Sequence, residues 1–311
     1  MKVIAKAGSE DVALVYIAQM DNGRLIEFVE SVQPPIPREK KWVLILSTLY
    51  GCPVGCLFCD AGNNYQGKLS KRDMFAQIDY LIARRFADRK VPVNKFKIQF
   101  ARMGEPAFNE AVLDVLEELP ELYEVPGLMP ALSTIAPSGC ERFFERLLQI
   151  SERIYRGRFQ LQFSIHTTDG DLRDWLIPVK KWELKEMAEY GGAFYREGAR
   201  KVTLNFALAE GMPVSSEVLL KHFDPDKFFI KITPVNPTYG ARKNEITSHI
   251  LPERHDYEII DALKKAGYQV ILSIGELEEN HIGSNCGQHI TNYLQKKEIV
   301  QGGYTYPLQE V

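Results

Sequence analysis

The sequence lacks any long hydrophobic run. No segment reaches the roughly 18–20 consecutive apolar residues that a membrane-spanning helix needs, and the first residues, MKVIAKAGSEDVALVY, hold no apolar signal core before their acidic side chains. We therefore expect a mature, cytoplasmic protein without a membrane span. An excess of charge is lacking too, because the net charge of −3 over 311 residues gives no overall attraction to nucleic acid. Contact with RNA would need a local basic patch.

Cysteine is scarce and odd in number, with five residues in the whole chain. A small secreted disulfide scaffold would use an even and denser set. Three of the five, Cys52, Cys56 and Cys59, lie within eight positions of one another, whereas Cys140 and Cys286 stand alone. Clustered thiols in a cytosolic chain indicate metal binding or catalysis rather than cross-linking.

The length suits one large α/β domain of roughly 200–250 residues with small extensions, or two ordinary domains. After residue 40 short β-rich runs alternate with longer helical runs, which predicts a parallel sheet with helices on its outside. Six such units fit a partial (β/α)6 barrel, open or closed, better than a two-sided sheet, although periodicity alone does not separate the two. The predicted strands are 42–47, 96–101, 129–133, 159–166, 201–208 and 228–234, with a further run at 268–274.

We divide the chain into three segments: a β-hairpin extension and linker at 1–37, the barrel at 38–275, and a C-terminal loop and helix carrying Cys286 at 276–311. The hairpin is predicted from two apolar runs, 12–18 and 25–29, that flank the turn sequence Asp-Asn-Gly. Three prolines between 34 and 37 then form a stiff linker. We expect this extension to pack on the barrel, and it is too short to be a separate RNA-binding domain.

The stretch Gly51-Cys52-Pro53-Val54-Gly55-Cys56-Leu57-Phe58-Cys59 follows the first barrel strand, and loops after barrel strands carry active sites. Three thiolates on one short loop can bind three corners of a four-iron cluster and leave the fourth iron open. Structural zinc is the alternative, but zinc takes four ligands. Only a distant residue such as Cys286 could supply the fourth, so the spacing favours the cluster.

The spacing Cys-x3-Cys-x2-Cys, with an aromatic residue before the last cysteine, resembles the signature of the radical S-adenosylmethionine (SAM) superfamily. The resemblance implies a radical SAM barrel with a [4Fe-4S] cluster on Cys52, Cys56 and Cys59. It implies that SAM binds the open iron through its amino and carboxylate groups. It also implies an external one-electron reductant, such as flavodoxin or ferredoxin, whose electron converts SAM into a 5′-deoxyadenosyl radical.

Further motifs, in order along residues 24–295, resemble the RlmN/Cfr family of radical SAM methyltransferases, which act on an adenine of large-subunit ribosomal RNA. These motifs are Ser47-Thr48, Met103-Gly104-Glu105-Pro106, Leu132-Ser133-Thr134, Ser164-Ile165-His166, Asp171-Leu172-Arg173-Asp174, Ile177-Pro178-Val179-Lys180-Lys181, Pro234-Val235-Asn236-Pro237 and Cys286-Gly287-Gln288.

The RlmN/Cfr resemblance implies roles for single residues. Those expected to bind SAM are Gly104, Glu105, Ser133, Ser164, His166 and Asn236. Each serine or asparagine could instead be a helix cap or turn residue. Cys286 is expected to receive a methyl group from one SAM, lose a hydrogen from it to the radical of a second, and add the resulting carbon to the substrate. The alternative interpretation is that Cys286 is a buried, inert thiol. Glu30 is expected to match the family's general base.

The chain departs from the family at one decisive position. Family members carry a second cysteine seven residues before the first cluster cysteine, and its attack on the methylated cysteine releases the product. Here that position is Ile45, which cannot form a disulfide. We also expect no counterpart of the family's N-terminal helical RNA-binding domain. We therefore hypothesise a diverged relative with an altered substrate or an altered last step.

Three functions remain open from the sequence. The first is methyl transfer to an unactivated carbon of an RNA base or nucleotide-like substrate through Cys286. The second is a diverged radical SAM reaction on a small metabolite or peptide, without methyl transfer, in which Cys286 donates a hydrogen atom or a proton. The third is a non-catalytic sensor that binds the cluster. We favour the enzymes, because the cluster loop and several pocket positions occur together.

Overall fold

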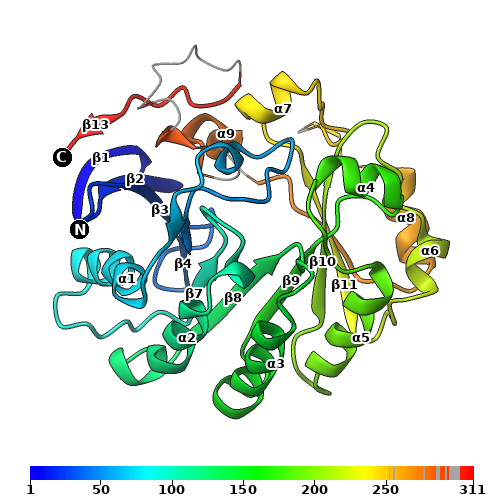
Figure 1. The fold of residues 1–311 in the computed structure, drawn as a ribbon, viewed down its shortest axis with the longest axis horizontal. Helices are drawn as coiled ribbons and strands as arrows, with labels where there is room; N and C mark the ends of the chain where they lie inside the picture. The colour runs from blue at the N-terminus through cyan, green and yellow to red at the C-terminus, as the bar shows by residue number, and fades with distance from the viewer. Residues whose placement is uncertain (252, 255, 276, 285–287, 291–292, 294–301) are drawn as a thin grey trace.

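The computed structural model describes residues 1–311 apart from 252, 255, 276, 285–287, 291–292 and 294–301. One eleven-stranded sheet dominates it, with the strand order β12-β11-β10-β9-β8-β7-β4-β3-β2-β1-β13, and β5 pairs with β6 in a small second sheet. Figure 1 shows the strands fanned out, with α1, α2, α3 and α5 along the outer side of the fan. The strands are β1 (Lys2–Ser9), β2 (Ala13–Gln19), β3 (Leu25–Ser31), β4 (Lys41–Leu46), β5 (Leu49–Tyr50), β6 (Gly67–Lys68), β7 (Lys95–Phe100), β8 (Leu128–Thr134), β9 (Gln160–Ser164), β10 (Val202–Leu208), β11 (Phe228–Pro234), β12 (Val270–Leu272) and β13 (Gln309–Glu310).

The helices fill the connections between these strands. The α-helices are α1 (Lys71–Arg85), α2 (Ala111–Leu122), α3 (Glu141–Ile150), α4 (Gly170–Leu176), α5 (Leu184–Phe194), α6 (Ser216–Leu220), α7 (Tyr239–Lys243), α8 (Glu258–Lys265) and α9 (Leu277–Ile282), and the short 3-10 and π turns are η1 (Asp60–Asn63), η2 (Pro106–Phe108) and η3 (Ser151–Tyr155). Among the described helices, none has the length and apolar character that crossing a membrane would require.

The parallel part of the sheet runs from β4 through β7, β8, β9, β10 and β11 to β12, each strand beside the next in chain order. Two neighbouring parallel strands can be joined only by a crossover connection that passes over one face of the sheet. The helices lie in these crossovers. The predicted α/β class with a large parallel-dominated sheet is confirmed. Each of the seven predicted strand segments overlaps a strand of this series.

The N-terminal segment extends the main sheet instead of packing on it. The hairpin of β2 and β3 forms as predicted, with Val15 opposite Val29. An additional strand, β1, precedes it, and β3 pairs with β4 so that Val29 faces Ile45. A two-stranded hairpin alone is marginally stable in water, whereas pairing with β4 satisfies its edge. The predicted division into 1–37, 38–275 and 276–311 stays a prediction, and strands from all three segments share this sheet.

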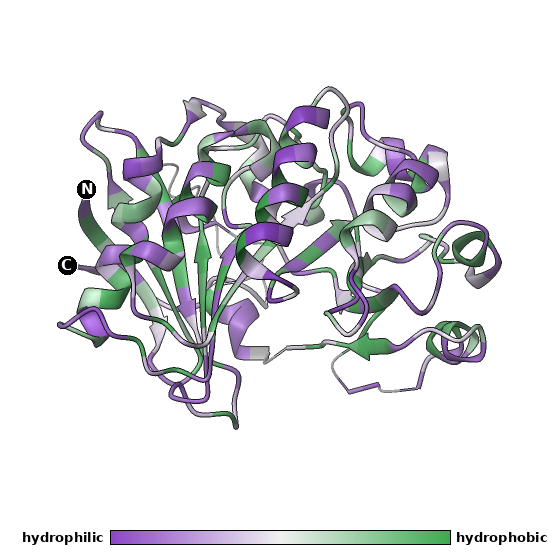
Figure 2. Cartoon of the chain, turned by 90° about the horizontal axis from the view of Figure 1, so that it is seen from below, coloured by the Kyte–Doolittle hydropathy of each residue, from purple (hydrophilic) through white to green (hydrophobic). Residues whose placement is uncertain are grey.

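The two faces of the sheet differ sharply in chemistry. On β4 and β7 buried residues alternate with half-buried ones, because successive side chains point to opposite faces. The outer face carries Trp42, Phe96 and Phe100, which pack with the buried side of α1. The inner face carries polar residues such as Gln99. Figure 2 shows hydrophobic strand residues behind helices whose exposed sides are largely hydrophilic.

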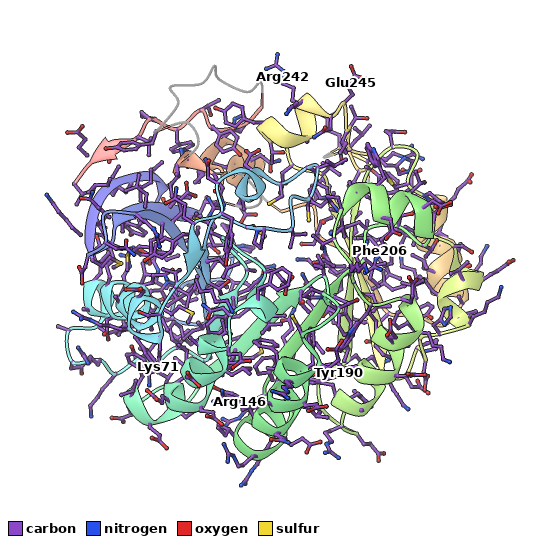
Figure 3. All side chains as sticks on the ribbon, in the orientation of Figure 1. Lys71, Arg146, Tyr190, Phe206, Arg242 and Glu245 are labelled. Carbon is purple, nitrogen blue, oxygen red and sulfur yellow. The ribbon has the colours of Figure 1, made fainter. Side chains whose placement is uncertain are left out.

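Helix α1 follows the rules expected from its sequence. The Ser70 side chain accepts a hydrogen bond from the Asp73 N–H, and the Asp73 carboxylate accepts one from the Ser70 N–H, which completes a capping box. At the surface, Lys71 pairs with Glu118 of α2 at 2.6 Å, and Arg146 of α3 pairs with Asp114 and Glu117 of α2 at 2.7 Å. Figure 3 shows Lys71 and Arg146 on these outer helices. Such exposed pairs add little stability, so the buried inner faces of the helices hold the layer.

Candidate active site

One cavity of about 340 Å³ lies at the carboxyl ends of the parallel strands. It collects residues from the loops after β4, β7, β8, β9 and β11, which are far apart in the sequence. Cys52, Cys56 and Cys59 line it. So do the residues predicted to bind SAM, which are Gly104, Glu105, Ser133, Ser164, His166 and Asn236. The structure therefore brings these predicted positions to one place.

The cysteine loop depends on glycine at two positions. Gly51 has a φ of +73°, and a Cβ there would lie 2.3 Å from the carbonyl oxygen of Asn64. Gly62 approaches Gly55 so closely that a Cβ on Gly62 would lie 2.8 Å from the Gly55 Cα. Across the loop, the Cys52 N–H donates to the Ala61 carbonyl at 2.7 Å. These contacts fold the chain into a tight turn around the three thiols.

The connection between β11 and α7 holds the same loop from the opposite side. The Thr238 hydroxyl donates to the Phe58 carbonyl at 2.6 Å. The Asp60 carboxylate accepts the N–H groups of Tyr239 and Gly240 at 3.2 and 2.8 Å, and the Tyr304 hydroxyl at 2.6 Å. The last contact joins the cysteine loop to the C-terminal segment. The position of the three thiols is thus set by residues that are distant in sequence.

The electrostatics of the thiols suit a positively charged partner. Burial raises the pKa of Cys52 to about 11, although a backbone hydrogen bond from Val54 acts in the opposite direction. Burial and the neighbouring Cys52 raise the pKa of Cys56 well above its usual value. Thiolates there need compensation by metal, which an iron–sulfur cluster provides. The three thiols, the tight glycine turn and the adjoining cavity fit such a cluster with one open corner.

A centre for a single metal ion would need a different arrangement of ligands from that of the iron–sulfur cluster. Within the described ranges, no group of three or more His, Cys, Asp and Glu side chains is arranged for one metal ion, such as zinc would need. Cys140 lies outside the main cavity, beside a second depression lined by Lys68, Phe108 and Glu110. Burial raises the pKa of Cys140 to about 11. A neutral, partly buried thiol of this kind fits a structural role.

Glu105 is fixed by three donors. The Thr134 hydroxyl and the Ala107 N–H donate to its Oε1 at 2.5 and 3.0 Å, and the Ile135 N–H donates to its Oε2 at 2.9 Å. Burial still raises the pKa of Glu105 to about 7. Gly104 has a φ of +99°, and a Cβ there would collide with the Leu49 side chain. Glu105 therefore caps η2 and lines the cavity at once, with lone pairs left on Oε2 for another donor.

His166 is held as a neutral ring. Its φ is +70°, and its Nδ1 accepts the Ala207 N–H at 3.0 Å. The ring meets the Phe58 ring edge-on, with centroids 4.9 Å apart. Burial and the charge of Arg173 lower the pKa of His166 to about 3. With Nδ1 accepting, the hydrogen lies on Nε2, which is left as a donor at the cavity wall.

Ser133 joins two inner-face amides. The Nε2 groups of Gln99 and Gln162 donate to its Oγ at 3.3 and 3.2 Å. The neighbouring Asn205 Oδ1 is buried and has no hydrogen-bond partner among the described residues. Asn205, Gln99 and Gln162 were not predicted as site residues. The sequence did contain a signal for them. Strands at the centre of a parallel sheet are normally apolar throughout, so polar residues at alternate positions of such strands indicate a face that lines a site.

The structure contradicts the prediction for Glu30. Glu30 pairs with Leu44, so it lies on the outer, helix-covered face of β3, whereas Ile45 of the same strand pair lines the cavity. Its carboxylate accepts the Tyr16 hydroxyl at 2.7 Å, the Trp42 Nε1–H at 3.1 Å and the Arg85 guanidinium at 2.8 Å. A carboxylate so placed cannot reach a substrate in the cavity. Its role is to bind α1 to the sheet.

Glu27, on the inner face of β3, carries the carboxylate that contacts the cavity-lining Arg102, and sequence reasoning missed it. Glu27 and Arg102 form an ion pair of 2.7 Å with both side chains about 1% exposed or less. Arg102 also donates to the Gly283 carbonyl at 2.8 Å, and the Ile290 N–H donates to Glu27. The sequence signal that could have identified Glu27 is a glutamate within an otherwise apolar, buried β-strand. Cys286 itself lies outside the described residues, but these contacts fix the chain on both sides of it.

Comparison with solved structures shows which fold the chain shares. The fold matches a radical SAM methyltransferase from Sphaerobacter thermophilus with a TM-score of 0.66, covering 93% of this chain and 81% of that one at 22% identity. No family model matches the chain. The chain thus shares its fold with that solved protein.

Sequence comparison then gives the particular relatives. The dual-specificity RNA methyltransferase RlmN of Halorhodospira halophila is 25% identical over 294 residues, or 92% of this chain and 75% of that protein. The RlmN of Wolinella succinogenes is 25% identical, covering 92% and 83%. The ribosomal RNA large subunit methyltransferase N of Nitrosopumilus maritimus is 25% identical, covering 89% and 77%. The predicted resemblance to the RlmN/Cfr family is confirmed, as is the prediction of an enzyme of the methyltransferase kind.

Proposed function

We propose that the chain is a radical SAM enzyme, built on a partial (β/α)6 barrel, that methylates an unactivated carbon of an RNA base or nucleotide-like substrate through Cys286. The observation that carries the proposal is the single cavity shared by Cys52, Cys56, Cys59 and the predicted SAM-binding residues. Cys52, Cys56 and Cys59 would hold the cluster, which together with SAM supplies a 5′-deoxyadenosyl radical. The relatives, named as RNA methyltransferases, support the substrate class.

The lining residues then have distinct tasks. Glu105 has its carboxylate fixed by Thr134 and two backbone amides, so its remaining lone pairs are oriented for the SAM amino group. His166 presents its Nε2–H, and Asn205 presents a buried carbonyl that has no partner among the residues that the structure describes. A buried acceptor of this kind favours a ligand that donates to it. These groups bind and orient the cofactor.

Arg102 supports the role of Cys286. Its side chain lines the cavity and also holds the Gly283 carbonyl, while its partner Glu27 holds the Ile290 N–H. The buried pair therefore holds Gly283 and Ile290, the two ends of an eight-residue segment. In the sequence, Cys286 lies within that segment. We assign the Glu27–Arg102 pair to positioning this segment.

Ile45 defines how the reaction must differ from that of the family. It lines the cavity and stands where the family has its resolving cysteine. A covalent adduct of substrate and Cys286 would therefore persist until another group opens it. Electrons for SAM cleavage would come from a flavodoxin or ferredoxin, and the expected compartment is the cytoplasm.

Anaerobic reconstitution with methyl-labelled SAM tests the proposal. 5′-Deoxyadenosine and the label on Cys286 are followed with and without total RNA, in wild type, Cys286→Ala and, as a matched thiol control, Cys140→Ala. We expect label on Cys286 in wild type and Cys140→Ala. Formation of 5′-deoxyadenosine with unlabelled Cys286 would reject methyl transfer and favour a radical reaction on a small metabolite or peptide. An intact cluster without formation of 5′-deoxyadenosine would reject both enzyme functions and favour a non-catalytic sensor that binds the cluster.

A further inference from the structure

The Tyr304 hydroxyl connects two parts of the chain that the proposed reaction must bring together. It donates to the Asp60 carboxylate at 2.6 Å and accepts the Gln288 N–H at 3.0 Å. Asp60 directly follows Cys59 in the sequence, and Gln288 lies two positions after Cys286. One hydroxyl thus links the neighbour of a predicted cluster ligand to a residue close to the cysteine that is expected to receive the methyl group.

Both hydrogen bonds are shielded from water. Asp60, Gln288 and Tyr304 are each 4–5% exposed. Burial and the charge of Asp60 raise the pKa of Tyr304 well above its usual value, so the hydroxyl keeps its proton and remains a donor. If the hydroxyl were removed, the Gln288 N–H would lose its acceptor in a buried position, which costs free energy because bulk water does not replace the partner.

The Tyr304 ring has its own contacts with the same parts of the chain. It stacks on the Tyr239 ring of α7, with centroids 5.3 Å apart and an angle of 14° between the planes. It meets the His289 ring edge-on, with centroids 5.5 Å apart. Gly283 lies so close that a Cβ there would come within 2.7 Å of the Tyr304 Cδ1. The ring therefore contacts residues that precede and follow Cys286 in the sequence.

The backbone at Tyr304 adopts a conformation that a bulky side chain disfavours. Its φ is +54°, in the left-handed region that such residues rarely occupy. The Tyr304 N–H donates to the Asn280 carbonyl at 3.2 Å, and the next N–H, of Thr305, donates to the His281 carbonyl at 2.9 Å. These bonds to α9 fix the strained residue. Strain of this kind occurs preferentially at functional sites, and it is an indication independent of the side-chain contacts.

We propose that Tyr304 is a positioning residue that couples the cysteine loop to the described residues on both sides of Cys286. The inference deepens the proposed function and rests on it, because it concerns how that same site aligns its cysteine. A bound cluster would fix the cysteine loop and with it Asp60, and Tyr304 would pass this constraint on to Gln288. Tyr304 is not among the described residues that line the cavity, so it acts through these two partners and not on a ligand.

Amide hydrogen exchange before and after anaerobic reconstitution of the cluster tests the coupling. In wild type, reconstitution should slow exchange at Gln288 about tenfold, which corresponds to the gain of one buried hydrogen bond. In Tyr304→Phe, which keeps the ring, exchange at Gln288 should be fast with and without the cluster. An equal response to the cluster in wild type and Tyr304→Phe would overturn the proposal, as would the lack of a response in wild type.

Tyr268→Phe is the matched control, because it also removes one buried tyrosine hydroxyl. The Tyr268 hydroxyl donates to the Phe223 carbonyl at 2.6 Å within the main hydrophobic core. Both variants should lower the free energy of unfolding in urea. Exchange at Gln288 should nevertheless respond to the cluster in Tyr268→Phe as it does in wild type. Loss of the response in both variants would show that Tyr304 acts through general stability alone.

The kinetics of Cys286 labelling separate positioning from cofactor binding. With methyl-labelled SAM at saturation, Tyr304→Phe should label Cys286 at least about tenfold more slowly than wild type, because a small displacement of a reacting group slows its reaction strongly. The SAM concentration that gives half the maximal rate should not change. A higher half-saturating concentration with an unchanged maximal rate would assign Tyr304 to cofactor binding and reject the positioning role.

The exchange experiment and the methyl-transfer assay can fail separately. A response to the cluster at Gln288 without label on Cys286 would retain the coupling and reject the proposed reaction. Label on Cys286 without that response would do the reverse.

Discussion

Replacing Glu27 by glutamine should release the segment on either side of Cys286. The change removes the negative charge from a pair in which Arg102 lies 2.7 Å away and both side chains are almost fully buried. Breaking a buried pair by removing one partner typically costs about 3–5 kcal/mol, because the other charge stays buried. That is a large share of the roughly 5–15 kcal/mol by which a domain is stable. Part of the cost here falls on Gly283 and Ile290, which the pair holds.

The matched control is Glu30→Gln on the same strand. Glu30 is equally buried and is also paired with arginine, Arg85 at 2.8 Å, but on the outer face of the sheet. Both variants should lower the free energy of unfolding in urea. Only Glu27→Gln should increase amide hydrogen exchange at Gly283 and Ile290. It should also reduce labelling of Cys286 by about a hundredfold, as expected when a reacting group is displaced by about 1 Å.

Two results would refute this reasoning. One is equal loss of Cys286 labelling in Glu27→Gln and Glu30→Gln, which would reduce the effect to general destabilisation. The other is normal labelling in Glu27→Gln with faster amide exchange at Gly283, which would show that the anchored segment has no part in the reaction.

Three further predictions follow from the site. Cys56→Ser should abolish iron–sulfur absorption near 400 nm after reconstitution, whereas Cys140→Ser should leave it unchanged; equal iron content in both would contradict the cluster assignment. Gly51→Ala should cost about 1–3 kcal/mol, since φ is +73° and the new Cβ meets the Asn64 carbonyl, and iron retention should fall with it; an unchanged urea midpoint would disprove the strain. His166 has its pKa lowered to about 3 from 6.5, so the unfolded chain binds the extra proton and stability is lost as pH falls from 6.5 toward 3. Wild type should lose about 2 kcal/mol more than His166→Asn between pH 7.5 and about pH 5; equal losses in urea unfolding would show that His166 is charged in the fold.

Sequence reasoning succeeded where the signal is local. The seven parallel strands and the glycine-rich cysteine loop each depend on residues within about ten positions of one another. It failed where the contact spans the chain. Arg102 reaches Gly283 across 181 residues, and Tyr304 reaches Asp60 across 244. No periodicity encodes such contacts, since they depend on how the C-terminal segment returns over the sheet.

The error over Glu30 has a specific physical cause. Glu27 and Glu30 lie three positions apart on β3, so the pleat directs their side chains to opposite faces of the sheet. A motif comparison aligns residues along the chain and does not record which face each occupies. The pairing of Val29 with Ile45 fixes the register of β3 against β4, and this register places Glu30 among the helices and Glu27 on the inner face, where it pairs with the cavity-lining Arg102. One strand thus supplies a structural carboxylate to the outer layer and a positioning carboxylate to the site, and a shift of a single residue in that register would exchange them.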